Sequence, residues 1–230
     1  MPKQSRTTLE PRKAPVQARS TASVDAILKA TIQVLIKVGK ERLTTTLVAK
    51  RAGVSVGTLY QYFPNKSALL RAALQGHINA IEAALEAVCR EQAGAPLAMM
   101  AKALATGYLE AKMKDPKASV ALYSVSSDVD GVRIAREASL KALHSIAAML
   151  ATSSDELSTD SEIVAAMLQA TLAGVSRRLL ESASPEREYE TLRDELVFLV
   201  STYVRACSLK RSGSRAERTK TEIALTRRTA

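Results

Sequence analysis

The strongest constraint on the fold lies in residues 49–63, which read AKRAGVSVGTLYQYF. Gly53 separates two short stretches of helix-forming residues, and glycine accepts the positive φ that a tight turn between helices requires. Ala49 is small enough to let two helices cross closely, and Ser55 is a good cap for the second helix. Because these demands agree in their spacing, the segment predicts a helix-turn-helix over about residues 44–63.

The rest of the chain also favours helices. Only 9 of its 230 residues are glycine and 7 are proline, whereas 47% are hydrophobic, so the chain can bury a substantial core in helical form. We expect an all-α protein with an N-terminal three-helix domain over 20–75 and a larger helical domain over 76–208. The proline-containing basic residues 1–19 predict a flexible arm, and the basic residues 209–230 predict a disordered tail.

The charge of the chain is unevenly distributed. The net charge is +10, and residues 1–75 carry 13 Lys and Arg against 3 Asp and Glu. Residues 76–204 carry 12 basic against 18 acidic residues. A basic first third followed by an acidic middle indicates that the first third binds a polyanion, and double-stranded DNA fits a helix-turn-helix. The alternative is an ordinary solvated basic surface.

The outer face of the helix-turn-helix carries side chains suited to DNA. Hydroxyl groups at the start of the first short helix, together with its free amides, can bind a phosphate. Small residues at the start of the second helix allow close entry into the major groove, and tyrosine hydroxyls can reach the backbone. The expected DNA-binding residues are Thr45, Thr46, Val56, Gly57, Thr58, Tyr60, Tyr62 and Lys66. Capping and packing roles are the structural alternatives for these residues.

Residues 20–75 resemble the DNA-binding domain of the TetR family of bacterial transcriptional regulators. The resemblance rests on a threonine-rich start, on AKRAGVSVGTLYQYF and on the following KSALL. It implies a homodimeric repressor that a small-molecule effector releases from its operator by binding the helical C-terminal domain. It also implies DNA contacts at the eight positions named above.

The last two predicted helices, over about 160–183 and 185–208, have more apolar surface than one core needs. A helix that is apolar on more than one side is usually buried on more than one side. Pairing these helices with their copies in a two-fold four-helix bundle would bury the excess, and a thick intramolecular core is the alternative. The expected dimer residues are Leu168, Leu172, Val175, Leu179, Leu196, Leu199 and Tyr203.

The intermediate helices carry side chains that could line an apolar cavity with a few polar groups. Methionine adapts to varied ligands, although methionine at helical spacing also occurs as ordinary core. The expected effector-pocket residues are Met100, Leu104, Tyr108, Met113, Tyr123, His144 and Met149. The sequence does not identify the effector.

Several other classes of protein are disfavoured. The chain has two histidines, two distant cysteines (Cys89 and Cys207) and no HExxH, GxSxG or phosphate-loop pattern, so we expect no enzyme activity, metal site or cofactor. The N-terminus lacks the apolar core of a secretory signal, and no run appears long enough to span a bilayer. We therefore expect a cytoplasmic protein with no membrane partner. The alternative function is a helical adaptor or nucleoid-type protein without an effector.

Overall fold

The computed structural model describes the backbone of residues 18–208 and the side chains of residues 21–208. Over these residues the chain forms nine α-helices, one short 3-10 helix and no strand. The expected all-α fold is therefore confirmed. The arm expected over 1–19 lies outside the described residues as far as residue 17, and the tail expected over 209–230 lies outside them entirely.

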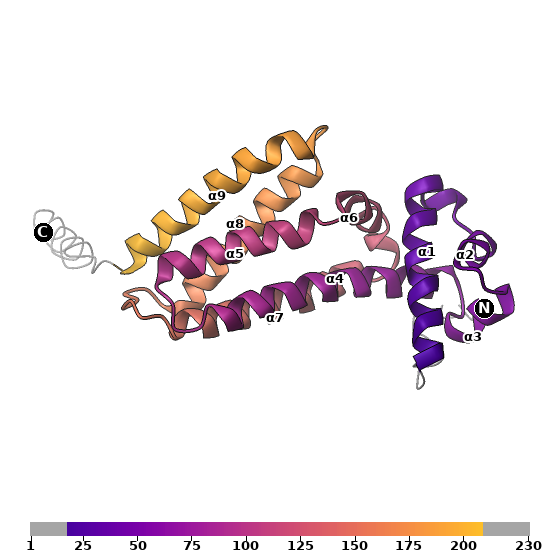
Figure 1. Ribbon diagram of the computed structural model, residues 1–230, viewed down its shortest axis with the longest axis horizontal. Coiled ribbons are helices and arrows are strands. Elements are labelled where there is room, and N and C mark those ends of the chain that lie inside the picture. Colours follow the sequence, from indigo (N-terminus) through magenta and orange to yellow (C-terminus); the bar gives the residue numbers. More distant parts are fainter. Residues whose placement is uncertain (1–17, 209–230) are drawn as a thin grey trace, which may run out of the picture.

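Three helices form a small N-terminal head, at the right of Figure 1. They are α1 (Ala18–Arg42), α2 (Thr45–Ala52) and α3 (Val56–Tyr62). Regular helix in α1 is interrupted at Gly39, which adopts φ 75° and ψ 171°, a backbone conformation that glycine accepts without a steric penalty. The core of the head is closed by buried apolar side chains of all three helices, including Ile27, Val48 and Leu59.

Six further helices form an elongated body. They are α4 (Lys66–Glu91), α5 (Leu97–Met113), α6 (Pro116–Tyr123), α7 (Gly131–Ala151), α8 (Ser161–Leu180) and α9 (Pro185–Ser208), with the 3-10 helix η1 (Ser126–Asp128) between α6 and α7. Side-chain caps fix several starts: Asn65 accepts from the Ala68 amide at 2.8 Å, and Asp115 accepts from the Ala118 amide at 2.9 Å. Because α4 runs from the head into the body (Figure 1), the boundary expected at 75/76 falls within a continuous helix.

The α6–η1 segment belongs to the body in sequence but contributes to the core of the head. Leu122, Val125 and Val129 are fully buried among the apolar side chains of α1 and α4. Next to these side chains, Lys40 near the end of α1 forms an ion pair with Asp128 of η1. The two parts of the molecule therefore share one packed junction.

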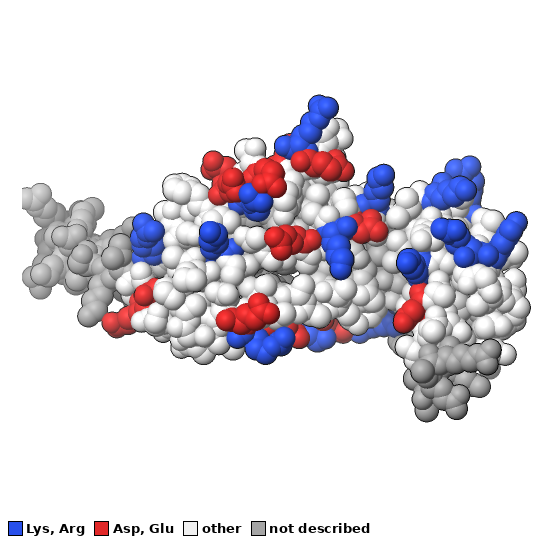
Figure 2. Space-filling view, viewed as in Figure 1, with Lys and Arg blue, Asp and Glu red and all other residues white. Residues whose placement is uncertain are grey.

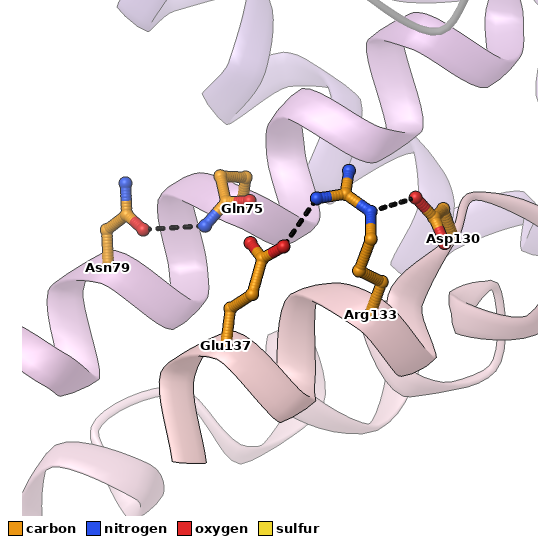
Figure 3. A network of polar contacts seen from close by, with 5 residues as sticks. All are labelled: Gln75, Asn79, Asp130, Arg133 and Glu137. Carbon is orange, nitrogen blue, oxygen red and sulfur yellow. Dashed lines mark hydrogen bonds and ion pairs between the residues drawn. The ribbon is translucent and has the colours of Figure 1, made fainter. Parts of the chain in front are cut away.

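The start of α7 is fixed by a compact polar network (Figure 3). Asp130 is the one non-glycine residue with positive φ in the described chain, at 61°. Its carboxylate accepts a 2.6 Å hydrogen bond from Arg133, whose guanidinium also donates to Glu137 at 2.6 Å. The neighbouring Gly131 packs directly against Ser126. A Cβ added at Gly131 would lie 2.6 Å from the carbonyl oxygen of Ser126. This network and close approach fix the direction in which α7 leaves η1.

Helices α8 and α9 each leave an apolar stripe exposed. Phe198 is 69% exposed and Leu199 is 52% exposed on α9, and Ile163 and Met167 are 58% and 50% exposed on α8. By length and composition alone, α8 is also apolar enough to cross a membrane, with 33% of its most apolar window buried. The core helix of a soluble protein can have the same length and composition, and Val164, Leu168 and Leu172 of α8 are buried in the core of the body.

The structure corrects most of the expected dimer residues. Leu168, Leu172, Leu179 and Leu196 are buried inside the chain itself, because the helical period turns them toward α5 and the other body helices. Val175 and Tyr203 are half-buried, and Leu199 is exposed. Four of the seven expected residues are therefore buried within one chain and not available to a second copy, and a dimer interface on α8 and α9 stays a prediction.

Candidate nucleic-acid interface and ligand cavity

The turn between α2 and α3 has the geometry that its sequence predicts. Gly53 adopts the left-handed conformation, with φ 72° and ψ 27°, and the amide of Val54 donates to the carbonyl of Ala49 at 3.0 Å. Ser55 then caps α3 by accepting a 2.9 Å hydrogen bond from the amide of Thr58. Because both caps are satisfied locally, they fix the angle at which α3 leaves the turn.

Hydroxyl groups of the two short helices meet on one side of the head. The hydroxyls of Thr45 and Tyr60 lie 3.1 Å apart, and those of Ser55 and Thr58 lie 2.8 Å apart. Thr45 begins α2, whose first amides are free of intrahelical partners. The arrangement brings an aromatic hydroxyl, a threonine hydroxyl and a helix N-terminus together, which suits an oxygen-rich anion such as a phosphate.

The eight expected DNA-binding residues differ in accessibility. Thr46, Gly57 and Tyr60 are exposed, and Thr45 and Thr58 are half-buried. Val56 and Tyr62 are half-buried and pack against the core of the head. Lys66 has an internal partner, because its ammonium donates a 2.6 Å hydrogen bond to the carbonyl oxygen of Lys40. The structure therefore gives Lys66 a role in joining α4 to the end of α1.

Basic side chains gather over the head, whereas acidic and basic side chains alternate along the body (Figure 2). On the head, Lys29, Lys37 and Lys50 are exposed. Arg51 is held by a 2.7 Å hydrogen bond to Gln33, which fixes its guanidinium between α1 and α2. The sequence alone did not indicate Lys50, which lies on the exposed side of α2.

A cavity of about 740 Å³ lies in the body between α4, α5, α6, α7 and α8. Its walls are mainly alanines and branched apolar residues, including Ile78, Ile81, Leu85, Ile146, Leu172 and Leu180. Gln169 of α8 bridges to α7 by donating to the carbonyl oxygen of Ser139 at 2.6 Å. This volume and lining are typical of a site for a small organic molecule.

The structure corrects the expected pocket residues. Tyr108 and Tyr123 line this cavity, whereas Met113 lines a separate surface groove of α4, α5 and α9. The buried side chains of Met100, Leu104 and Met149 are ordinary core, and His144 is exposed. These four residues lie on helices that border the cavity but are not among the residues that line it.

Lys112 is the cavity residue that sequence analysis missed. It is only 8% exposed, and its ammonium donates to the hydroxyl of Tyr123. The spacing of the sequence could have indicated Lys112, because Leu104, Tyr108 and Lys112 follow one another at four-residue intervals and so share one side of the helix. A lysine that continues an apolar stripe of a helix points inward.

A polar chain of contacts ties Lys112 to two neighbouring helices. The hydroxyl of Ser119 on α6 donates to the carbonyl oxygen of Lys112 at 3.2 Å and lies 3.0 Å from Nε2 of His77 on α4. Burial lowers the pKa of His77, and the positive charge of Lys112 lowers it further, while Asp115 acts in the opposite direction. His77 is therefore neutral at pH 7 and fits a role as donor to Ser119.

Comparison with known protein families decides the relationship. The family described as "Bacterial regulatory proteins, tetR family" matches residues 27–73, and the family described as "Tetracyclin repressor-like, C-terminal domain" matches residues 96–203. The two matches together cover both the head and most of the body. The chain belongs to the TetR family. The resemblance inferred from the helix-turn-helix is thus confirmed, and it extends to the C-terminal domain.

One TetR-family relative is the HTH-type transcriptional repressor KstR of Mycolicibacterium smegmatis (strain ATCC 700084 / mc(2)155). It is 47% identical over 57 residues, which are 25% of this chain and 28% of KstR. The chain therefore matches only about a quarter of the length of this curated relative. The similarity concerns the head.

Solved structures show the same TetR-family fold over a larger span. A transcriptional regulator from Rhodococcus sp. Rha1 has a TM-score of 0.66 and 23% identity, covering 81% of this chain and 98% of that one. SmeT, the repressor of the Stenotrophomonas maltophilia multidrug efflux pump SmeDEF, has a TM-score of 0.58 and 21% identity, covering 84% and 93%. At these identities the likeness concerns the arrangement of helices.

Proposed function

We propose that this TetR-family protein is a cytoplasmic, sequence-specific transcriptional repressor that binds a near-palindromic operator and releases it when a small molecule enters the body cavity. The observation that carries the proposal is the outer face of α2 and α3. There, the paired hydroxyls of Thr45 and Tyr60 adjoin a helix start, and Gly57 leaves the first turn of α3 open. Such a face suits a major groove between two phosphate backbones.

The repressor acts as a homodimer through the exposed stripes of α8 and α9. Phe198, Leu199, Ile163 and Met167 would otherwise expose a large apolar patch to water. A two-fold copy that packs on the same stripes buries this patch in a four-helix bundle. The dimer presents two heads to successive turns of one face of the duplex, about 34–36 Å apart.

Release from DNA follows from the shared junction of head and body. Tyr123 and Ser126 line the cavity, while their neighbours Leu122 and Val125 are buried in the core of the head. A ligand that repositions α6 and η1 therefore changes the packing against α1 and α4, and with it the spacing of the two heads. The ligand lowers operator affinity to the extent that it binds the altered conformation more tightly.

Selection of bound duplexes from a random pool by the purified full chain tests this function. The expected result is enrichment of a near-palindrome whose half-sites are one helical turn apart. In a parallel selection, Thr58→Ala should change the preferred base within each half-site, because Thr58 lies in the first turn of α3, the part proposed to enter the major groove. Enrichment of no sequence by the parent chain would overturn the proposal in favour of a helical adaptor.

A further inference from the structure

Lys112 places a positive charge at a cavity whose walls are mainly apolar. The residue lies in the last turn of α5, where the helix dipole favours a cation. Its Nζ lies 5.7 Å from the ring centroid of Tyr108 and 4.9 Å from that of Tyr123. The ammonium therefore lies close to two aromatic rings that line the cavity, and the side chain as a whole is buried.

The charges along the cavity wall are balanced except at Lys112. Arg177 is paired with Glu181 at 2.8 Å, and Glu82 is paired with Lys141 at 3.5 Å. Among residues 21–208, by contrast, no carboxylate oxygen lies within 4.0 Å of the Lys112 ammonium. The described part of the chain thus leaves one buried cation without a counter-charge.

Such a cation is costly, and its protein partners offset only part of the cost. An ammonium carries three hydrogen-bond donors, and the hydroxyl of Tyr123 is the acceptor that the described residues supply to it. Contact with an aromatic ring stabilises an ammonium only modestly, whereas burying a charge without a counter-charge is strongly unfavourable. Burial is the main cause of the lowered pKa of neighbouring His77, and the positive charge of Lys112 adds to it. An anion beside Lys112 would remove this imbalance.

The remaining walls define the rest of the ligand. Away from Lys112 the cavity is bounded by Ile78, Ile81, Ile146, Leu172 and Leu180, which favour a hydrocarbon or aromatic body. One lysine and one tyrosine hydroxyl match a single negative charge. A dianionic phosphate ester would bring a second charge into an apolar site, where its desolvation would oppose binding.

We propose that the cavity binds an amphiphilic organic monoanion, a carboxylic acid with an apolar body, whose carboxylate pairs with Lys112. The inference rests on the proposed function, in which this cavity is the site of the effector. It also gives a route by which binding can reach the head: a carboxylate that binds Nζ changes the charge and position of the ammonium, which donates to the hydroxyl of Tyr123. Tyr123 lies at the end of α6, next to Leu122 in the core of the head.

The test compares decanoate with decan-1-ol, two probes of equal chain length that differ in charge. Isothermal titration of the full chain should give decanoate at least tenfold higher affinity than decan-1-ol, below the micellar concentration. Lys112→Met should lower decanoate affinity at least tenfold and leave decan-1-ol within about twofold, since methionine keeps the length of the side chain without its charge. A tenfold change corresponds to about 1.4 kcal/mol.

Two further variants make the result specific. Lys114→Met removes an exposed lysine two residues away that does not line this cavity, and it should retain the preference for decanoate. Ala135→Trp fills space at the α7 wall and should weaken both probes. Thermal unfolding of each variant verifies that it is folded.

The proposal is overturned if Lys112→Met leaves decanoate affinity unchanged, or if the parent chain binds decan-1-ol at least as tightly as decanoate. Operator binding, measured without ligand on the same preparations, separates this failure from that of the proposed function. A chain that binds its selected duplex but shows no preference for decanoate contradicts only the ligand class. A chain that binds no duplex contradicts the repressor function.

Discussion

The hydroxyl groups of Thr45 and Tyr60 lie 3.1 Å apart although the residues are 15 positions apart in the chain. The contact joins the first residue of α2 to the outer side of α3. It holds the tyrosine hydroxyl against the first residue of α2, where the Leu47 amide is capped by Thr44 and the amides of Thr45 and Thr46 have no intrahelical partner. A phosphate could bind the hydroxyl and these amides together. The proposed contact with the DNA backbone therefore depends on how α2 and α3 are placed relative to each other.

Tyr60→Phe should weaken binding to every duplex by a similar factor, about 3- to 10-fold for the loss of one hydrogen bond. Sequence preference should not change, because a phosphate contact carries no base information. Fluorescence anisotropy with the selected duplex and an unrelated duplex measures both effects. Tyr189→Phe on α9, far from the head, is the control, and equal affinities of Tyr60→Phe and the parent would remove Tyr60 from the interface.

Gly57→Ala separates folding from DNA binding. An added Cβ at Gly57 would lie 3.6 Å from the Ser55 hydroxyl oxygen, an ordinary contact, and alanine favours a helix over glycine by up to about 1 kcal/mol. The variant should be at least as stable as the parent in urea, yet bind its operator about tenfold more weakly because the methyl group blocks close approach. Gly76→Ala on α4, where nothing lies within 4 Å, should leave DNA affinity unchanged. A Gly57→Ala variant that keeps full affinity would contradict the major-groove position of α3.

The exposed stripe of α9 predicts the effect of Phe198→Glu. Placing a carboxylate at the centre of an apolar dimer interface should convert the protein to monomers in sedimentation velocity experiments and reduce operator affinity at least tenfold. Val132→Glu is the matched control, because Val132 is 78% exposed on α7, away from this stripe. If Phe198→Glu sediments as a dimer, the interface lies elsewhere.

The lowered pKa of His77 predicts a specific dependence of stability on pH. Burial and the charge of Lys112 disfavour the protonated ring in the folded chain, so the unfolded chain binds a proton first as the pH falls through about 6.5. The free energy of unfolding should therefore decrease from pH 7.5 to pH 5.5. His77→Gln should make this decrease smaller in urea titrations, whereas His144→Gln, at the exposed second histidine, should not. Identical pH profiles for His77→Gln and the parent would contradict the lowered pKa of His77 in the folded chain.

The sequence predicted the head better than the body for a physical reason. The turn at Gly53 and the caps at Ser55 and Asn65 are satisfied by neighbours within five residues, so local sequence determines them. The internal hydrogen bond of Lys66 joins residues 26 positions apart, and no local pattern indicated it.

The body depends on which side of each helix faces the other helices. Leu196 and Phe198 are both apolar and two residues apart, yet one is buried inside the chain and the other is 69% exposed. The sequence indicated excess apolar surface on α8 and α9 but not its direction. For the same reason Met100 was expected in the cavity, where the structure instead has Lys112.

Operator affinity as a function of half-site spacing tests the central claim most directly. At physiological salt, the purified full chain should bind its selected duplex at least about 10³-fold more tightly than an unrelated duplex. Inserting five base pairs between the half-sites turns one head to the opposite face of the helix and should remove most of that advantage. Equal affinity for the selected, respaced and unrelated duplexes would contradict a paired helix-turn-helix that recognises DNA.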